Sequence, residues 1–258
     1  GMRLPVDPTV RNERGARRSF RTLSTILLFA VTAFPRVSAQ AVGLPFAVRY
    51  TTTTSARVFL NPTSPSSAVR NEYVTADGLY GVAAELQVPV TPELAFTLAV
   101  EYLQHVEEGD RPIALGGSLR TLPVRDGFVV IPVEIGGAAT IPISDETFRL
   151  TMGAGVGATF LHRIQEIAGV GVTTEGTPVG YGIHVSVEFD FLLLSGVYGH
   201  VAARFRDPEV TVTTRYAKAT TVHQGTTLVL PSEPMHTRVN VDGLSLSVGI
   251  AVDLHRLF

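Results

Sequence analysis

Residues 243–258 read GLSLSVGIAVDLHRLF, and along this stretch apolar residues alternate with small or polar ones. The apolar residues occupy every second position: Leu244, Leu246, Val248, Ile250, Val252 and Leu254. Ser, Gly, Ala, Asp and His fill the positions between them. Because successive side chains of a β-strand point to opposite faces, the segment predicts a strand with one apolar face and one small, polar face.

The same period-two alternation recurs in segments rich in Val, Ile, Thr, Phe and Tyr, which clusters of Pro, Gly, Asp and Ser separate. Eight strands are predicted, at 45–60, 77–90, 95–105, 127–143, 148–162, 179–191, 197–216 and 240–258. After residue 40 the sequence shows no periodicity of an amphipathic helix. The fold class is therefore predicted to be all-β.

The predicted connections alternate strictly between short and long. The short ones are 91–94, 144–147 and 192–196, and the long ones are 61–76, 106–126, 163–178 and 217–239. A membrane barrel has an even number of strands, and it closes because lipid offers no partner to an unpaired backbone group. The pattern predicts an eight-stranded antiparallel up-and-down transmembrane β-barrel with short periplasmic turns and long extracellular loops. A soluble, lipocalin-like binder is the alternative.

Aromatic residues gather near both ends of the predicted strands. Near the short turns are Phe96, Phe148, Phe189, Phe191, Tyr198 and Phe258, and toward the long loops are Tyr80, Tyr102, Phe128, Phe160, Tyr181, Phe205 and Tyr216. Two such bands are typical of the girdles that membrane proteins place at the two interfaces. We interpret them in this way.

The first 39 residues have the three parts of a secretory signal peptide. Five arginines lie between Arg11 and Arg21, an apolar stretch runs from Leu23 to Phe34, and small residues precede and include Ala39. A positive region, an apolar region and a small-residue cleavage site are typical of export signals. We predict cleavage after Ala39, which leaves residues 40–258 as the outer-membrane barrel domain.

Composition excludes several classes of function. The chain has no Cys, which rules out disulfides, zinc–thiolate and iron–sulfur sites and a cysteine nucleophile. Seven of the 21 basic and two of the 23 acidic residues lie in 1–39, so residues 40–258 carry a net charge of −7. Such a charge does not favour a nucleic-acid partner. Mean hydropathy is +0.25, yet no apolar run is long enough for a spanning helix.

The predicted barrel resembles the small outer-membrane β-barrels of Gram-negative bacteria, of the eight-stranded OmpA/OmpX type. The resemblance covers the mature chain as architecture, and its most specific feature is the alternating final strand that ends in Phe258. Arg256 departs from the apolar or aromatic residue that is usual two positions before the end. The resemblance implies an outer-membrane location, contact with membrane lipid and lipopolysaccharide, and recognition of Phe258 by the barrel assembly machinery.

A barrel of eight strands is only wide enough to hold its own side chains, so the inward faces should fill it. Strand parity places inward Arg49, Glu85, Gln87, Glu101, Glu134, Arg149, His184, Glu188, Asp190, His200, Arg204, Arg206, Asp253 and His255. Buried charges are tolerated when they are paired. We therefore predict a salt-bridge network of Arg49, Glu85, Glu101, Glu134, Arg149, Glu188, Arg204 and Asp253. Within it, Glu101, Glu134 and Glu188 are the expected partners of Arg149 and Arg204. An ion- or proton-conducting path through the same charges is the functional alternative.

Glycines also fall on the predicted inward faces. Gly153, Gly155 and Gly157 lie on one strand, and Gly136 lies on its neighbour. We expect them to make room for bulky charged side chains opposite or to permit sharp curvature. No strand-to-helix transition follows them, so a phosphate-binding loop is excluded.

His184, Ser186 and Glu188 share one strand face at i, i+2 and i+4, the spacing of a base, a hydroxyl nucleophile and an acid. The spacing is similar to the His-x-Ser pair of the lipid A deacylases. The flanking residues do not match that motif, and parity points these side chains inward, whereas such a site would face lipid. These residues are the alternative catalytic set; the leading expectation is that the protein is not an enzyme.

No metal site or cofactor is predicted. His162, His223 and His236 lack ligand spacing, and the acidic segment 107–110 is interpreted as hydrated surface. The Thr-rich segment 210–216 predicts that the last two strands extend beyond the membrane as a protruding hairpin. Its exposed edge would recruit a surface protein partner by strand addition.

The predicted function is therefore a structural or surface-interaction role for a barrel with a plugged lumen. Narrow-pore transport of small solutes and lipid modification are the alternatives within the membrane.

Overall fold

The structure is a computed structural model that describes residues 45–254 except 116–117, 145–146 and 242. The predicted signal peptide, His255, Arg256 and Phe258 lie outside the described residues. Within them, no helix is long and apolar enough to cross a membrane.

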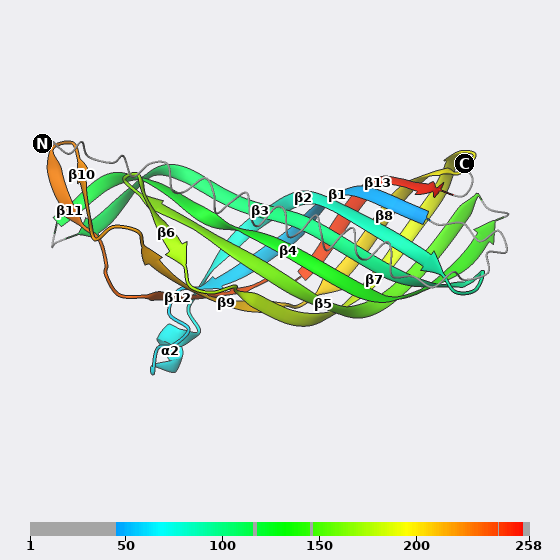
Figure 1. The fold of residues 1–258 in the computed structure, drawn as a ribbon, viewed down its shortest axis with the longest axis horizontal. Helices are drawn as coiled ribbons and strands as arrows, with labels where there is room; N and C mark the ends of the chain where they lie inside the picture. The colour runs from blue at the N-terminus through cyan, green and yellow to red at the C-terminus, as the bar shows by residue number, and fades with distance from the viewer. Residues whose placement is uncertain (1–44, 116–117, 145–146, 242, 255–258) are drawn as a thin grey trace, which may run out of the picture. The chain divides into compact units, whose positions relative to one another are not determined.

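Strands make up most of the described chain, with one short helix, α2 (Ser67–Arg70) (Figure 1). The strands are β1 (Pro45–Phe59), β2 (Tyr73–Pro89), β3 (Leu94–Leu115), β4 (Ser118–Ser144), β5 (Phe148–Ile167), β6 (Val170–Thr174), β7 (Val179–Leu194), β8 (Val197–Arg206), β9 (Glu209–Tyr216), β10 (Thr220–His223), β11 (Thr226–Val229), β12 (Met235–Asn240) and β13 (Gly243–Asp253). The all-β prediction is confirmed.

Eight of these strands close an antiparallel ring, the spanning ring, in the order β1–β2–β3–β4–β5–β7–β8–β13. The ring closes where β13 pairs with β1, so that Val48 of β1 lies between Ala84 of β2 and Ile250 of β13. Tight connections join β2 to β3, β4 to β5 and β7 to β8 at one end of the ring. The predicted eight-stranded antiparallel barrel is confirmed.

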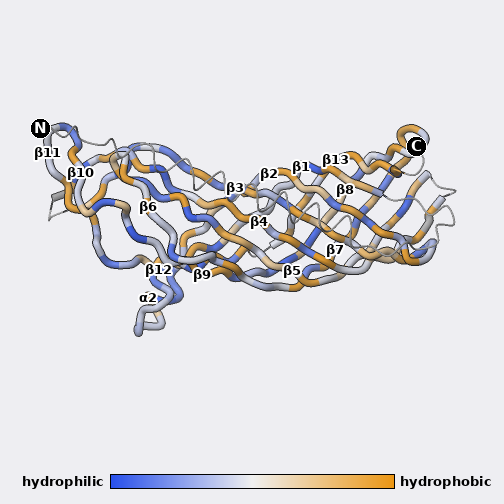
Figure 2. The backbone as a smooth tube through the Cα atoms, in the orientation of Figure 1, coloured by the Kyte–Doolittle hydropathy of each residue, from blue (hydrophilic) through white to orange (hydrophobic). Residues whose placement is uncertain are grey.

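The two faces of the spanning ring differ as the alternation predicts. On β13, Leu244, Leu246, Val248 and Ile250 each expose 42–58% of their surface. Ser245, Ala251 and Asp253, from the alternate positions, are buried inside. Figure 2 shows the same alternation of apolar and polar residues along the strands of the ring. An exposed apolar band around a polar interior fits hydrocarbon outside the barrel.

A second ring of eight strands, the extension, continues the wall at the other end. The ends of β1–β5 that lie away from the tight connections join β6, β9 and β12 to form it. These strands pair in the order β5–β6–β9–β12–β1. The prediction that 106–126, 163–178 and 217–239 are loops was therefore wrong for most of their length. β3 and β4, for example, stay paired out to Leu115 and Ser118.

Short interruptions between consecutive strands separate the strands of the spanning ring from those of the extension. The predicted strand 197–216 divides into β8 and β9 at Asp207-Pro208, and the predicted strand 240–258 is divided between Asn240, the last residue of β12, and β13, which begins at Gly243. Pro208 has no N–H to donate to a neighbouring strand, which accounts for the first break. As a result, β8 pairs with β7 and β13 in the spanning ring, whereas β9, which follows it, pairs with β6 and β12 in the extension.

Next to the spanning ring the inward side chains of the extension are mainly apolar, and farther out Arg163, Thr214 and Thr237 are buried as well, with Arg163 paired to Asp126. The apolar side chains form one buried cluster, the extension core: Ala56, Val58, Ala76, Leu79, Leu103, Phe128, Val130, Leu161, Val210, Val212, Val239 and Val241. The change occurs on a continuous face, since β8 buries Arg204 and Arg206 and β9 buries Val210 and Val212. The part of the extension next to the spanning ring therefore has an apolar core, the reverse of the charged interior of the spanning ring.

Two aromatic residues assigned to the girdles are fully buried inside the molecule instead, and a third, Tyr216, is half-buried against a second apolar cluster. Tyr198 is 2% exposed, and Phe128 is 1% exposed within the extension core. Phe96, Phe148, Phe189, Tyr102, Tyr181 and Phe205 do face outward. The face on which an aromatic side chain lies is therefore decided by its parity along the strand, and not by its distance from a turn.

The predicted free edge near 210–216 is also wrong. β9 pairs with β6 on one side and β12 on the other, and β12 pairs onward with β1. The remaining strands, β10 and β11, form a separate two-stranded sheet.

Candidate functional site: the charged lumen

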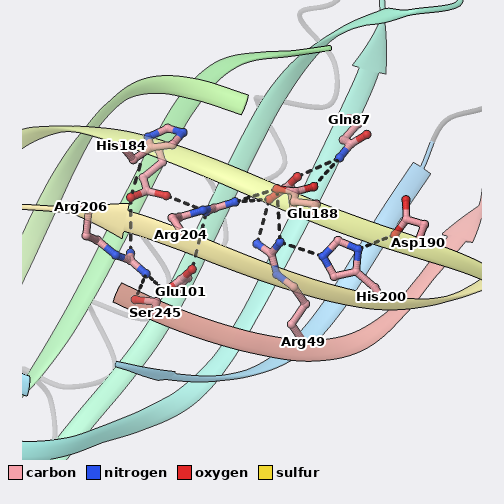
Figure 3. Close-up of polar contacts among 12 residues, drawn as sticks. Arg49, Gln87, Glu101, His184, Glu188, Asp190, His200, Arg204, Arg206 and Ser245 are labelled. Carbon is pink, nitrogen blue, oxygen red and sulfur yellow. Dashed lines mark hydrogen bonds and ion pairs between the residues drawn. The ribbon is translucent and has the colours of Figure 1, made fainter. Parts of the chain in front are cut away.

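The guanidinium of Arg204 lies at the centre of the polar network in the spanning ring (Figure 3). Its Nη1 donates to Glu134 at 2.7 Å, and its Nη2 donates to Glu85 at 2.6 Å and to Glu188 at 3.3 Å. Glu101 lies 3.6 Å away. These acids come from β4, β2, β7 and β3, so one side chain of β8 links strands on opposite sides of the lumen.

Toward the short-turn end, the network continues through Arg49. Its Nη2 donates to Glu85 at 2.8 Å, and its Nη1 lies 3.2 Å from Nε2 of His200. Nδ1 of His200 lies 2.6 Å from Asp190. Asp190 in turn pairs with Arg149 at 3.4 Å, and the Arg149 guanidinium stacks 3.9 Å from the Tyr198 ring centroid.

Toward the extension, the network continues through Arg206. This side chain pairs with Glu101, lies 3.4 Å from Glu134, and donates to Ser245 Oγ at 3.1 Å. Ser245 lies 2.8 Å from the hydroxyl of Thr53. The polar contacts therefore run continuously from Arg149 to Thr53, and the extension core begins beyond them.

Glycines of β5 provide the space for three side chains around this network. A Cβ at Gly153 would lie 2.6 Å from Ser186 Oγ, one at Gly155 would lie 2.7 Å from His184, and one at Gly157 would lie 2.8 Å from Glu134. Each neighbour occupies the volume that a side chain on β5 would need. The glycine stripe therefore makes room for bulky neighbours, as the sequence suggested.

The structure brings together most of the residues expected in the network. Arg49, Glu85, Glu101, Glu134, Glu188 and Arg204 make the contacts above, and Asp253 is buried on β13. Arg149 joins the network through Asp190 and not through the expected Glu101, Glu134 or Glu188, because its position on β5 lies directly opposite Asp190 of β7. Parity alone could not reveal this, since it fixes the face of a residue and not its height in the barrel.

Other members were outside the expected network. Arg206, Asp190 and His200 were placed inward by parity but not among its members, and Thr53 and Tyr198 were not placed inward at all. Ser245 lies on the polar face of the final strand, so the alternation of apolar and polar residues in that strand was the signal that could have placed it inward.

The alternative catalytic residues do not form a nucleophilic site. His184, Ser186 and Glu188 all point into the lumen and are at most 7% exposed. Glu188 is bound by Arg204 and by Gln87. Among the polar contacts of the described residues, none joins His184 to Ser186. In the same part of the chain, no group of three or more His, Asp or Glu side chains is arranged to hold a metal ion.

Loss of a single member of the network is expected to lower the stability of the barrel. The charges of the network are almost entirely buried, and removing one partner of a buried pair leaves an uncompensated charge at a cost of about 3–5 kcal/mol. What this arrangement can do chemically is hold opposite walls together and occupy the lumen.

Glu134→Ala tests this role. The change deprives Arg204 and Arg206 of an ion pair, and we expect the free energy of unfolding to fall by about 3 kcal/mol with strand content unchanged. Denaturant unfolding in detergent, followed by circular dichroism, measures it. Glu108→Ala, which removes an exposed ion pair with Arg125, is the control and should cost under about 1 kcal/mol. Equal losses in the two variants would contradict a buried structural network.

Gly153→Ala tests the glycine stripe. The added methyl group meets Ser186 Oγ, so we expect a loss of about 1–3 kcal/mol from overpacking. Ser186→Ala removes that oxygen, and in its background Gly153→Ala should cost little. The four proteins of this double-mutant cycle are compared by denaturant unfolding. A cost that is the same in both backgrounds shows that Ser186 is not the obstacle.

No protein-family model and no curated protein sequence matches the chain. Solved structures do share its fold. The outer membrane protein OprG from Pseudomonas aeruginosa superposes with a TM-score of 0.54 at 13% identity, over 82% of this chain and 95% of that one. Neisserial surface protein A gives 0.45 at 10% identity, over 83% and 98%. The outer membrane protease OmpT from Escherichia coli gives 0.45 at 8% identity, over 84% and 98%.

The likeness to OprG is one of fold, and it agrees with the chemistry of the two faces. A closed eight-stranded ring is apolar where it would meet hydrocarbon and charged where it is shielded from it. Together these observations show that the chain has the fold of the small outer-membrane β-barrel proteins of Gram-negative bacteria.

Proposed function

We propose that this protein is a closed, non-conducting barrel with a structural or surface-interaction role, in which the spanning ring anchors the extension outside the cell. The observation that carries the proposal is the filling of both rings. The charged network occupies the lumen of the spanning ring, and the extension core follows it along the axis. An ion would have to pass an apolar, dehydrated core, where burial of a charge is very costly.

The size and surface of the extension support an interaction role. From His105 to Leu115, β3 stays paired with β4, a length of roughly 30 Å at about 3.3 Å per residue. The outer surface carries ion pairs such as Glu175–Arg215 at 2.6 Å and Glu108–Arg125 at 2.8 Å, as a water-exposed surface would. A rigid extension of this length presents its tip well away from the membrane.

Several partners belong to the same proposal. Outer-membrane lipid and lipopolysaccharide would contact the apolar band, and a surface protein partner would meet the extension. Removal of residues 1–39 during export and recognition of Phe258 during assembly remain predictions from the sequence.

Narrow-pore transport is the second candidate, and the continuous network from Arg149 to Arg206 favours it over lipid modification. The network would provide polar groups for an ion only as far as the extension core.

Planar bilayer recording separates these functions. We expect the purified mature protein, inserted in a defined lipid bilayer, to give no stepwise conductance, because the extension core blocks the axis. A sixteen-stranded porin in the same bilayer is the positive control. Insertion is verified by the slower migration of the boiled protein in electrophoresis. Reproducible single-channel steps from the folded protein would overturn the proposal and favour the pore.

A further inference from the structure

The tip of the extension contains a cleft between two hairpins. One wall is the end of the β3–β4 hairpin, which contributes Asp110, Arg120 and Leu122, and the other is the β10–β11 hairpin, which contributes His223, Gln224 and Leu228. The cleft volume is about 460 Å³. This lies within the range of small-molecule sites, about 300–1,000 Å³.

Both walls are fixed in place. Gln224 and Gly225 have φ of 47° and 73°, the left-handed pair of a tight two-residue hairpin turn. Nη1 of Arg120, on the β3–β4 hairpin, donates to Thr226 Oγ1 of the β10–β11 hairpin at 3.2 Å, which joins the two walls. Beneath the cleft, Leu122 and Leu228 belong to a second buried apolar cluster with Ile167, Val170 and Leu230. A site on rigid elements loses little entropy when a ligand binds.

The lining differs in kind from the hollows on the spanning ring. Those hollows, of about 840 and 610 Å³, are lined almost wholly by apolar groups of the lipid-facing wall and suit acyl chains. In the tip cleft, polar groups dominate. They combine an acceptor (Asp110), a donor (Arg120) and two side chains that can do both (His223 and Gln224).

This combination favours a neutral, polyhydroxylated ligand. The formal charges of Asp110 and Arg120 cancel, so the cleft has no net attraction for an anion or a cation. A sugar hydroxyl donates and accepts at once, which matches mixed planar donors and acceptors.

A second cleft of about 300 Å³ adjoins the first and shares Asp110 and Pro123 with it. Its far side includes Glu166 and the Glu108–Arg125 ion pair. Two joined clefts give consecutive places along one path. A chain of linked sugars fits such a path better than a single compact molecule does.

We propose that this tip cleft is a saccharide-binding site that holds consecutive pyranose rings of a glycan, with Asp110 and Gln224 as hydrogen-bonding residues. The inference rests on the proposed surface-interaction role and names its ligand class. The saccharide can belong to the protein's own membrane, as the polysaccharide of lipopolysaccharide, or to another cell's surface.

The test uses the full mature chain, folded in a detergent without a sugar headgroup, such as lauryldimethylamine oxide. The probes are O-polysaccharide cleaved from smooth lipopolysaccharide, N-acetyllactosamine, maltose and cellobiose. Saturation-transfer difference NMR detects binding, and calorimetry measures Kd. We expect at least one probe to bind, and Asp110→Ala and Gln224→Ala each to raise its Kd at least tenfold. O-polysaccharide binding assigns the ligand to the protein's own membrane, and disaccharide binding assigns it to another surface.

Asp77→Ala, an exposed acid of β2 away from the cleft, is the matched control and should leave Kd unchanged. Heat-modified migration in electrophoresis verifies that each variant is folded. Absence of binding by every probe at millimolar concentration overturns the inference, and so does equal binding by the wild type, Asp110→Ala and Gln224→Ala. Either result leaves the proposed closed barrel to be judged by the bilayer recording alone.

Discussion

The surroundings of each strand change along its length, and the rest of the structure follows from that change. In the spanning ring hydrocarbon lies outside, so charges must be inside and paired, and every backbone group must be satisfied by closure. In the extension water lies outside, so the inward face next to the spanning ring becomes mainly apolar. β8 and β9 show both regimes on a single face, with Arg204 and Arg206 followed by Val210 and Val212.

The charged network and the glycine stripe are two parts of one packing solution. Acidic side chains from four strands contact or approach Arg204, and the lumen of an eight-stranded barrel has little space for them. Gly153, Gly155 and Gly157 remove three side chains from β5, and Ser186, His184 and Glu134 occupy that space. Closure, pairing and packing therefore depend on one another, and a change at one of these positions is felt at the others.

The sequence was sufficient to predict the spanning ring but less so the extension. Period-two alternation located its strands, its tight turns and its inward charges, because a two-sided apolar/polar contrast is strong there. In 106–126 Pro, Gly and charged residues suggested loops, yet pairing with a neighbour keeps that segment extended. Partners such as Asp190 for Arg149, and the inward position of Tyr198, depend on register and height, which alternation does not encode.

Spin-label accessibility along β8 and β9 tests the reversal of faces most directly, and the absence of Cys allows single-cysteine labelling without background. Labels at Val201 and Phe205 should be relaxed by oxygen, as in lipid, and a label at Thr211 by a water-soluble nickel complex. A label at Val212 should be reached by neither reagent, because that side chain is buried in the extension core. Nickel relaxation at Val212 equal to that at Thr211 would mean a water-filled interior and contradict the account.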